Sequence, residues 1–202
     1  MPTPTPRLVL ASGSTYRRAL LERLGLPFAV DSPSVDESAY PDEAAPATAQ
    51  RLAHAKAVAV LQRHPDALVI GSDQVATCNG LHIGKPLTHE NALAQLRMMR
   101  GQRVLFHTAL CLADGRRPDH PTLAFQHACV TTEVVFRDLP EHELDAYLRI
   151  EQPYDCAGSA KNEGLGIALL ESIQSTDPTA LTGLPLIALT TMLRQADVAF
   201  FQ

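Results

Sequence analysis

A short apolar run followed by a glycine and an aspartate constrains the fold of this chain more than any other stretch. Leu68, Val69 and Ile70 are large or β-branched apolar residues, which favour a buried strand. Gly71 follows them and permits a close backbone approach or an unusual turn. We therefore expect Asp73 where a strand meets a crevice, the place where open α/β sheets bind ligands. Alone the pattern is weak, because an aspartate after a strand is more often a turn or capping residue.

The rest of the chain divides into predicted strands and helices. We expect further strands at residues 7–11, 27–31, 103–113, 122–136 and 166–173. We expect helices at residues 15–24, 47–64, 88–100 and 140–150, and a last helix that ends near Ala196 with Pro185 at its first position. Asn79-Gly80 is a strong hairpin signal. Residues 32–46 form a polar, acidic segment, and we expect most of it to be a surface loop.

The first predicted strand and helix are joined by Ser12-Gly13-Ser14. Hydroxyls and unpaired helix-start N–H groups at this position, together with Arg17, make a cradle for a phosphate group. Arg17 shares a helix face with the apolar stripe that follows, which should point it into the crevice. The alternative is a serine-capped helix with two solvated arginines, and the segment alone does not separate these interpretations.

Composition limits the classes of protein to consider. Hydrophobic residues make up 46% and charged residues 19% of the 202 residues, so one globular unit with a substantial core is expected. The formal net charge of -5 disfavours a nucleic-acid-binding surface, which requires an excess of lysine and arginine. No apolar run reaches membrane-spanning length, and residues 1–6 lack the apolar segment of a signal peptide. We expect these first six residues to be a flexible N-terminus.

The cysteine and histidine spacings give no metal motif. Cys78, Cys111, Cys129 and Cys156 form no CxxC pair, so we expect small core residues in a reduced, cytoplasmic setting. The eight histidines show no HxxxH or HxH spacing, and none is predicted to bind metal. The sequence contains no GxGxxG or P-loop motif.

Several motifs in a fixed order resemble the Maf family of nucleoside triphosphate pyrophosphatases, from about Arg7 to Arg194. They are Leu8-Val-Leu-Ala-Ser-Gly-Ser-Thr-Tyr-Arg-Arg, Gly71-Ser-Asp-Gln-Val, Gly84-Lys-Pro-Leu, Ala157-Gly-Ser, Glu163-Gly-Leu-Gly and Gly183-Leu-Pro-Leu. The order of several motifs is far more specific than any single one. The chain is most similar to the branch that acts on 7-methyl-GTP, which carries Ser-Asp-Gln and Lys-x-Glu-Gly.

The branch of the family that acts on dTTP and UTP tends to have Ala-Asp-Thr, and a glutamine where this chain has Glu163. Two positions depart from the family pattern. Thr15 replaces a proline, which a helix start tolerates, and Tyr16 stands where tryptophan or arginine is common. The second departure leaves base specificity slightly open.

The resemblance implies an α/β fold similar to inosine triphosphate pyrophosphatases: a mixed, strongly curved sheet flanked by helices, with a cleft between two lobes. It implies one Maf-like domain over residues 1–202, a homodimer, and dependence on a divalent metal such as Mg²⁺ or Mn²⁺. The implied reaction is attack of water on the α-phosphorus, which would convert 7-methyl-GTP to 7-methyl-GMP and pyrophosphate and so remove a modified nucleotide.

The resemblance also suggests roles for particular residues. Asp73 is the expected general base or metal-bound carboxylate, and Glu37 and Asp73 are the expected oxygen ligands of the metal. Methylation at N7 makes guanine cationic, so Tyr16 is expected to stack on it and Glu163 to pair with it. A mid-helix lysine such as Lys56 is ordinarily solvated, but a triphosphate needs several cations. The predicted substrate-binding residues are Ser12, Tyr16, Arg17, Arg18, Lys56, Gln74, Lys85 and Glu163.

Two other functions remain open at this point. One is a pyrophosphatase for dTTP or UTP in the same family, against which Gln74 and Glu163 argue. The other is a non-catalytic nucleotide-binding regulator of cell division, given the family's association with septum inhibition. The combination of Asp73 with several cations favours catalysis, because a sensor needs no base.

Overall fold

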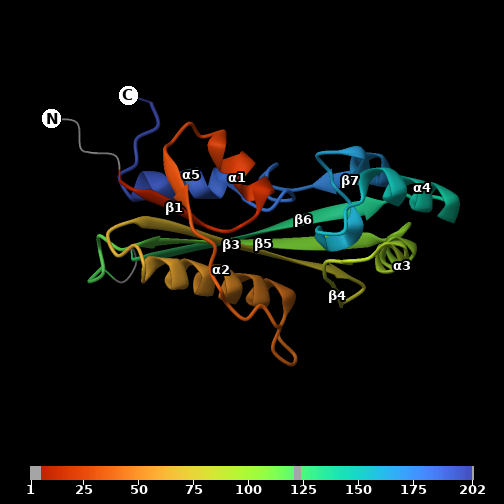
Figure 1. The fold of residues 1–202 in the computed structure, drawn as a ribbon, viewed down its shortest axis with the longest axis horizontal. Helices are drawn as coiled ribbons and strands as arrows, with labels where there is room; N and C mark the ends of the chain where they lie inside the picture. The colour runs from red at the N-terminus through yellow and green to blue at the C-terminus, as the bar shows by residue number, and fades with distance from the viewer. Residues whose placement is uncertain (1–5, 121–123, 202) are drawn as a thin grey trace. The chain divides into compact units, whose positions relative to one another are not determined.

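The computed structural model describes residues 6–120 and 124–201, and Figure 1 shows its fold. In chain order the elements are β1 (Leu8–Ala11), α1 (Thr15–Glu22), β2 (Phe28–Val30), α2 (Ala45–Leu61), β3 (Leu68–Cys78), β4 (Leu81–Ile83), α3 (His89–Met99), β5 (Arg103–Asp114), β6 (Phe125–Phe136), α4 (Glu141–Glu151), the 3-10 helices η1 (Ala157–Ser159) and η2 (Leu165–Leu169), β7 (Leu170–Gln174) and α5 (Leu186–Gln195). The predicted flexible N-terminus falls largely on residues 1–5, which lie outside the described residues.

The strands form one seven-stranded mixed sheet in the order β2-β1-β3-β5-β6-β7, with β4 paired to β3. β1 pairs in parallel with both β2 and β3, whereas β3–β4 and β6–β7 are antiparallel. Helices flank this sheet (Figure 1). The predicted α/β class, a mixed sheet flanked by helices, is therefore confirmed.

The central strand, β3, is longer than the sequence predicted. The apolar run was expected to end at Gly71, but β3 continues to Cys78, and its end from Ala76 to Cys78 pairs with β4. The predicted hairpin is confirmed: Asn79 and Gly80 both have positive φ, 50° and 81°, as a two-residue type I′ turn requires. A strand-ending glycine was the wrong interpretation, because Gly71 is itself paired within the sheet, with Ala11 of β1.

The glycine in β3 is needed for a close approach to a helix. A Cβ on Gly71 would lie 2.2 Å from the Ala53 carbonyl oxygen and 2.8 Å from the Ala57 nitrogen, both on α2. β1 also ends here, since its last residue, Ala11, pairs with Gly71. Asp73 therefore lies beyond the end of the neighbouring parallel strand, where no β1 backbone covers it.

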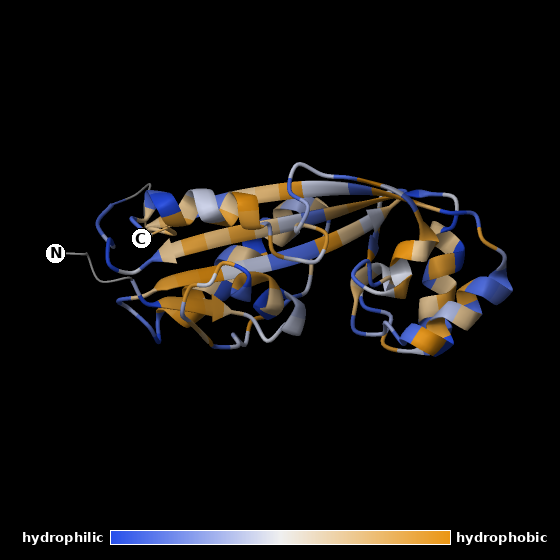
Figure 2. Ribbon diagram, turned by 90° about the horizontal axis from the view of Figure 1, so that it is seen from above, coloured by the Kyte–Doolittle hydropathy of each residue, from blue (hydrophilic) through white to orange (hydrophobic). Residues whose placement is uncertain are grey.

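The chain divides into two compact units. Unit 1 comprises residues 1–74, 108–130 and 177–202, and unit 2 comprises residues 75–107 and 131–176. The core of unit 1 joins leucines of β1, β3 and β5 to the apolar faces of α1 and α5. Its fully buried members include Leu10, Ile70, Leu110 and Leu189. Strand segments are coloured mostly as hydrophobic in Figure 2, as expected for strands covered by helices.

Unit 2 is built around α3 and α4, which pack against each other. Thr88 caps α3 by accepting a hydrogen bond from the Asn91 N–H, as its sequence predicted. Leu96, Leu144 and Leu148 are buried on the inner faces of these helices. Hydrophobic and hydrophilic segments alternate along the helices in Figure 2, which is typical of amphipathic helices.

Two smaller predictions differ from the structure. Residues 166–173 were predicted to be one strand, but the segment up to Leu169 is the 3-10 helix η2, and only then does β7 begin. A Cβ on Gly166 would meet the Lys161 backbone at 2.5 Å, so tight loop packing replaces an extended conformation there. Pro185 is the N-cap of α5 and not its first helical residue.

The cysteines also differ in part from the core role expected of them. All four are free; Cys78 and Cys111 are buried, but Cys129 and Cys156 are partly exposed. Within the described residues, no helix has both the length and the apolar character needed to cross a membrane.

Candidate active site

Three charged side chains of unit 1 meet around the Lys56 ammonium group. The Lys56 Nζ lies 2.6 Å from Asp73 Oδ1 and 2.6 Å from Glu37 Oε1. The side chains of Lys56 and Asp73 are only 7% and 9% exposed, whereas that of Glu37 is 58% exposed. Lysine is almost never buried unless it is paired, and a buried cluster of charged groups is a candidate functional site.

Local structure explains why Lys56 is buried although it lies in the middle of a helix. Gly71 allows α2 to approach β3 at backbone distance, with Ala53 and Ala57 in the contact. Lys56 precedes Ala57, so its side chain starts from the part of α2 nearest to β3. Asp73 then supplies the charge that a buried ammonium needs. The expectation of a solvated lysine, based on its position in the sequence alone, is wrong.

Arg17 joins the same charged region from α1. Its Nε donates a hydrogen bond of 2.9 Å to the Gly183 carbonyl, and its Nη1 donates one of 3.4 Å to Ser12 Oγ. Burial lowers the pKa of Arg17, while the charges of Asp73 and Glu37 raise it. Arg17 on α1 therefore lies within electrostatic range of both carboxylates, although Asp73 belongs to β3 and Glu37 to the loop before α2.

The serine segment before α1 is hydrogen-bonded within itself. Ser14 is the N-cap of α1 and accepts a hydrogen bond from the Arg17 N–H, and Ser12 Oγ accepts one from the Ser14 N–H at 3.1 Å. Ser12 is buried. The capped-helix interpretation and the phosphate-cradle interpretation are thus compatible, since the arginine that contacts Ser12 is the one near the carboxylates.

The Gly183 carbonyl links three segments of unit 1, and the sequence did not identify this role. The carbonyl accepts a hydrogen bond from Arg17 Nε and a second one, of 2.9 Å, from Ser72 Oγ on β3. Gly183 has φ of 111°, which other residues rarely adopt, and a Cβ there would lie 3.4 Å from Arg17 Nε. The available signal was a glycine two residues before Pro185, which marks a turn but does not indicate what its carbonyl contacts.

Gln74 is hydrogen-bonded to the same loop. Its Nε2 lies 2.8 Å from Thr108 Oγ1, 3.1 Å from the Ala180 carbonyl and 3.0 Å from the Leu181 carbonyl. The amide nitrogen of Gln74 therefore holds β3 to the segment before α5. Any contact of Gln74 with a substrate would use its remaining acceptor oxygen.

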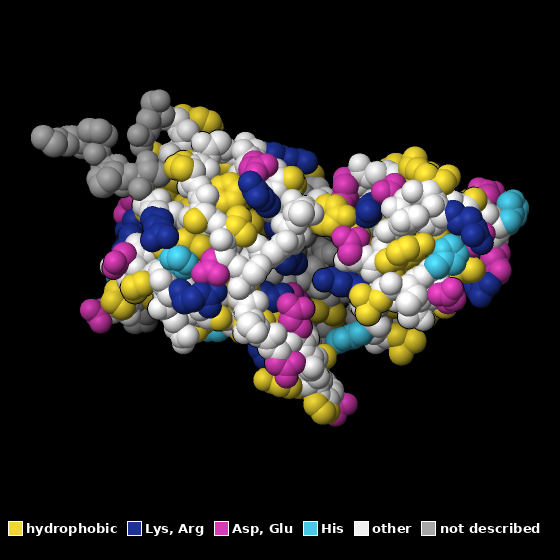
Figure 3. Space-filling view, in the orientation of Figure 1, with side chains coloured by type: hydrophobic (Ala, Val, Ile, Leu, Met, Phe, Trp, Pro, Cys, Tyr) yellow, Lys and Arg dark blue, Asp and Glu magenta, His cyan; other side chains and the backbone are white. Residues whose placement is uncertain are grey.

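The other two predicted residues of α1 are more peripheral. Arg18 is exposed and forms an ion pair of 3.0 Å with Glu22, one turn further along the helix. Tyr16 is partly exposed. On the face shown in Figure 3, Lys and Arg side chains are interspersed with Asp and Glu side chains. Of the two adjacent arginines, Arg17 is the one near the carboxylates.

Two predicted residues belong to unit 2. Lys85 is exposed in the segment between β4 and α3. α3 holds the backbone on both sides of it, because Gln95 Nε2 donates to the Gly84 carbonyl and Asn91 Nδ2 donates to the Pro86 carbonyl, each at 3.0 Å. The position of Lys85 within its unit is therefore well fixed.

Glu163 lies in a tight turn closed by a hydrogen bond of 3.1 Å from the Gly164 N–H to the Lys161 carbonyl. The turn is attached to α4, since Glu151 Oε2 accepts from the Leu165 N–H at 2.9 Å and Tyr147 Oη accepts from the Lys161 N–H at 3.1 Å. Glu163 itself is exposed. The turn thus presents a carboxylate to solvent from a rigid support.

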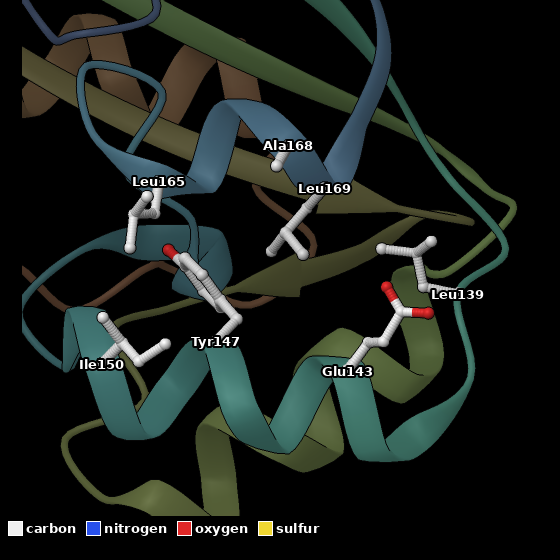
Figure 4. Close-up of a pocket in the computed structure, with 7 residues that line it drawn as sticks. All are labelled: Leu139, Glu143, Tyr147, Ile150, Leu165, Ala168 and Leu169. Carbon is white, nitrogen blue, oxygen red and sulfur yellow. The ribbon is translucent and has the colours of Figure 1, made fainter.

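A pocket of about 230 Å³ lies in unit 2 (Figure 4). Its lining is Leu139, Glu143, Tyr147, Ile150, Leu165, Ala168 and Leu169. The sticks in Figure 4 show Tyr147 and Ile150 projecting from α4 towards Leu165. Burial raises the pKa of Tyr147 to about 12, so its phenol stays protonated at neutral pH. None of the predicted site residues lines this pocket.

The carboxylates of unit 1 fit a hard divalent cation. Asp73 Oδ1 and Glu37 Oε1 each lie 2.6 Å from the same nitrogen, so the two oxygens cannot be further apart than twice that distance. Carboxylate oxygens are the donors that Mg²⁺ and Mn²⁺ prefer. Glu37 and Asp73 are the residues that would hold such an ion, with Lys56 as a neighbouring cation.

The chain belongs to the family described as Maf-like protein, whose model matches residues 7–196. This confirms the family that the motif order indicated.

Proteins named "7-methyl-GTP pyrophosphatase" are among its relatives. That of Cupriavidus pinatubonensis is 59% identical over 98% of this chain and 98% of its own length. That of Burkholderia lata is 64% identical over 97% of this chain and 92% of its own length. A solved structure from Mycobacterium abscessus, titled as a nucleoside-triphosphatase and dITP/XTP pyrophosphatase, has a TM-score of 0.43 and 13% identity, covering 95% of this chain and 97% of that one.

Proposed function

We propose that this protein is a nucleoside triphosphate pyrophosphatase that hydrolyses 7-methyl-GTP to 7-methyl-GMP and pyrophosphate. One observation carries the proposal: the buried Asp73–Lys56 pair, with Glu37 on the same ammonium and Arg17 close enough to sense both carboxylates. Such a group can activate water and hold a polyphosphate in one place. Membership of the Maf-like family supports the same conclusion.

In the proposed reaction a water molecule attacks the α-phosphorus, and pyrophosphate leaves. Asp73 accepts the proton of the attacking water or orients that water. Arg17 holds phosphate oxygens in a bidentate fork, and Lys56 and Lys85 supply point charges. Transfer reactions at phosphorus depend mainly on positioning and on stabilising negative charge, which are the contributions these side chains can make.

Members of the family generally use a divalent metal ion, and the carboxylates of Glu37 and Asp73 are suitable ligands for one. When bound by Glu37 and Asp73, the ion would polarise phosphate oxygens and lower the pKa of water. Lys56, which contacts both carboxylates, would then hold them in place. We propose Mg²⁺ or Mn²⁺ as the ion.

The proposed preference for 7-methyl-GTP is supported by the names of relatives that are about 60% identical over nearly the whole chain. N7-methylguanine carries a positive charge, which an exposed carboxylate such as Glu163 can pair with. Tyr16 offers an aromatic face for stacking, a contact estimated at about 1 kcal/mol when partly exposed. Ser12, Arg18 and Gln74 are proposed as further substrate-binding residues.

A pyrophosphate-release assay across 7-methyl-GTP, GTP, dTTP and UTP, with and without Mg²⁺ or Mn²⁺, tests the proposal. We expect metal-dependent release that is fastest with 7-methyl-GTP. Fastest release with dTTP or UTP would identify a pyrimidine nucleotide pyrophosphatase. Nucleotide binding without pyrophosphate release under any condition would instead identify a nucleotide-binding regulator.

The substitution Glu163→Gln tests the charge argument. It removes the negative charge and keeps the shape, so we expect the ratio of kcat/KM for 7-methyl-GTP to that for GTP to fall by roughly fivefold to tenfold, since a partly exposed ionic contact is worth about 1 kcal/mol. Glu171→Gln removes the same charge from an exposed position on β7 and serves as the control. An unchanged ratio in Glu163→Gln would refute the role of this carboxylate.

We also propose that the protein forms a homodimer and works in the cytoplasm, as one Maf-like domain. Membership of the Maf-like family supports the homodimer, and the four free cysteines support a reducing compartment such as the cytoplasm. Light scattering coupled to size-exclusion chromatography measures the mass directly. A single species of about 22 kDa would contradict the dimer, because the chain mass is 21.9 kDa.

A further inference from the structure

Two histidines and a cysteine meet in unit 1, on α2, β5 and β6. His54 Nδ1 lies 3.1 Å from His127 Nε2 and 3.8 Å from Cys111 Sγ. The three ligand atoms all lie within 4.8 Å of one another. These residues are far apart in the sequence and match no spaced metal motif, so only the fold brings them together.

The sheet explains why the three side chains point the same way. Successive side chains of a strand alternate between the two faces. Leu110 and Leu112 of β5 point into the core shared with α5, so Cys111 between them points to the opposite face. In β6, the Gln126 Nε2 donates to the Met192 carbonyl of α5, so the next residue, His127, also points to the opposite face.

We propose that His54, Cys111 and His127 form a binding site for Zn²⁺, with a water molecule as the fourth ligand. Imidazole nitrogen and thiolate sulfur are the donors that zinc prefers, whereas Mg²⁺ prefers oxygen. The carboxylate site at Glu37 and Asp73 and this site therefore select different classes of metal. The proposal does not depend on the enzymatic function proposed above.

Two of the three distances between the ligand atoms suit a tetrahedral ion, and the third, between Cys111 and His127, is at most 4.8 Å. Zinc bonds of about 2.0 to 2.1 Å to nitrogen and about 2.3 Å to sulfur place two nitrogens about 3.3 Å apart, and nitrogen and sulfur about 3.6 Å apart. The corresponding distances here are 3.1 Å and 3.8 Å. Each differs from the tetrahedral value by about 0.2 Å, which small side-chain rotations accommodate.

The proposed site is buried on the Cys111 side and open to solvent on the His127 side. Cys111 is fully buried, His54 is partly exposed and His127 is exposed. An ion at this place would have access from solvent on the His127 side, where a water ligand fits. On binding, the Cys111 thiol would lose its proton to solvent, so that a thiolate bonds the ion.

The site would fasten α2 to the sheet. His54 lies two residues before Lys56 on the same helix, and its two partners lie on β5 and β6. Coordination by all three elements would add a link between α2 and strands that do not carry Asp73. The expected consequence is greater thermal stability, because the ion binds the folded chain and not the unfolded one.

Cobalt substitution tests the proposal without using activity. After removal of metals with a chelator, Co²⁺ is titrated into the whole protein and the absorption spectrum is recorded. We expect a thiolate-to-cobalt charge-transfer band that saturates at one equivalent and the visible bands of tetrahedral cobalt. The carboxylate site offers no sulfur, so it cannot produce the charge-transfer band.

Matched variants identify the ligands. His127→Ala, at an exposed position, and Cys111→Ser should each abolish the charge-transfer band. Cys129→Ser changes a thiol two residues from His127 on the same strand, and its band should persist. A band that is absent from the parent, or that persists in folded His127→Ala, would overturn the proposal; so would a band lost only in Cys129→Ser.

A zinc-dependent shift of the melting temperature provides a second measurement. At free Zn²⁺ about 100 times the dissociation constant, the parent should gain roughly 5 to 10 °C, and His127→Ala should gain much less. Equal gains in the parent and in His127→Ala would place the stabilising ion elsewhere and refute the site.

Discussion

At the scale of single residues, Lys56 and Asp73 form the centre of the candidate active site. Each is nearly buried, and the 2.6 Å contact between them offsets only part of the cost of removing two charges from water. Glu37 adds a second carboxylate from a solvent-exposed loop. A buried cation between two anions costs stability to assemble, so its presence favours a role in binding or catalysis over a purely structural one.

The substitution Asp73→Asn should reduce turnover of the preferred nucleotide by about 100-fold or more, because an amide can neither accept the proton of water nor bind the metal as strongly. Pyrophosphate release measures the effect, and circular dichroism checks that the variant is folded. Asp66→Asn, which alters an exposed aspartate before β3, is the control and should leave turnover unchanged. Turnover of a folded Asp73→Asn variant within about tenfold of the parent would remove this residue from the mechanism.

The substitution Gly71→Ala should destabilise the protein by about 2 kcal/mol or more, because the new Cβ would overlap the Ala53 carbonyl on α2 and backbone yields less than a side chain. Urea denaturation measures the free energy of unfolding. Gly84→Ala is the control, since a Cβ there meets nothing within 4 Å, and its effect should stay within about 0.5 kcal/mol. Equal stability of the two variants would contradict the close approach of α2 to β3.

At the scale of elements, charged and polar side chains attach the ends of helices to the sheet. Asp31, after β2, binds Arg63 through two contacts of 2.9 and 2.7 Å and His64 through one of 2.8 Å, both just after α2. Asp177 lies ten residues before Ile187 in the sequence and accepts a hydrogen bond of 2.7 Å from its N–H group. This bond satisfies a donor at the start of α5 that has no partner within the helix. Such caps come from distant residues and escape rules based on neighbouring positions.

The stability of the protein should fall in acid partly through Asp31. Its hydrogen bonds with Arg63, and then His64, lower its pKa from 3.8 to about 2 in the folded chain. The folded chain therefore binds a proton at the Asp31 carboxylate less readily than the unfolded chain does. The contribution of Asp31 to the free energy of unfolding is present above pH 3.8 and is lost as the pH falls towards 2. The difference in unfolding free energy between the parent and Asp31→Asn should shrink over this range. A difference that is constant from pH 5 to pH 2 would contradict the prediction.

At the scale of the whole molecule, the chain leaves and re-enters each of its two compact units. Unit 1 draws on three stretches of sequence and unit 2 on two. β3, β5 and β6 each have residues in both units, because the unit boundaries fall within these strands. A division of this kind differs from two domains joined by a linker, in which boundaries fall in exposed loops.

We predict that the two units unfold in one cooperative transition. Unfolding of either unit would break strands whose other ends belong to the second unit. Hydrogen exchange measured by mass spectrometry at increasing urea distinguishes peptides of α5, in unit 1, from peptides of α3, in unit 2. Two separate transitions would contradict a single domain over residues 1–202.

The sequence by itself determined the local features of this protein. Periodicity and capping residues predicted most helices and strands, because these depend on neighbours within a turn or a strand pair. Asn79-Gly80 predicted its hairpin for the same reason, since positive φ at both positions is a local requirement. The order of motifs predicted the family, and the family model confirms it.

Only the tertiary structure decided which of these local features act together. The sequence around Lys56 is that of an ordinary helix lysine, and Lys56 is buried only because Gly71 lets α2 approach β3. His54 of α2 meets Cys111 and His127 only because these two side chains point from β5 and β6 to the same face of the sheet. The length of β3 likewise depends on pairing with β4. Burial and side-chain contacts are set by packing between distant segments, and no local rule of sequence contains that information.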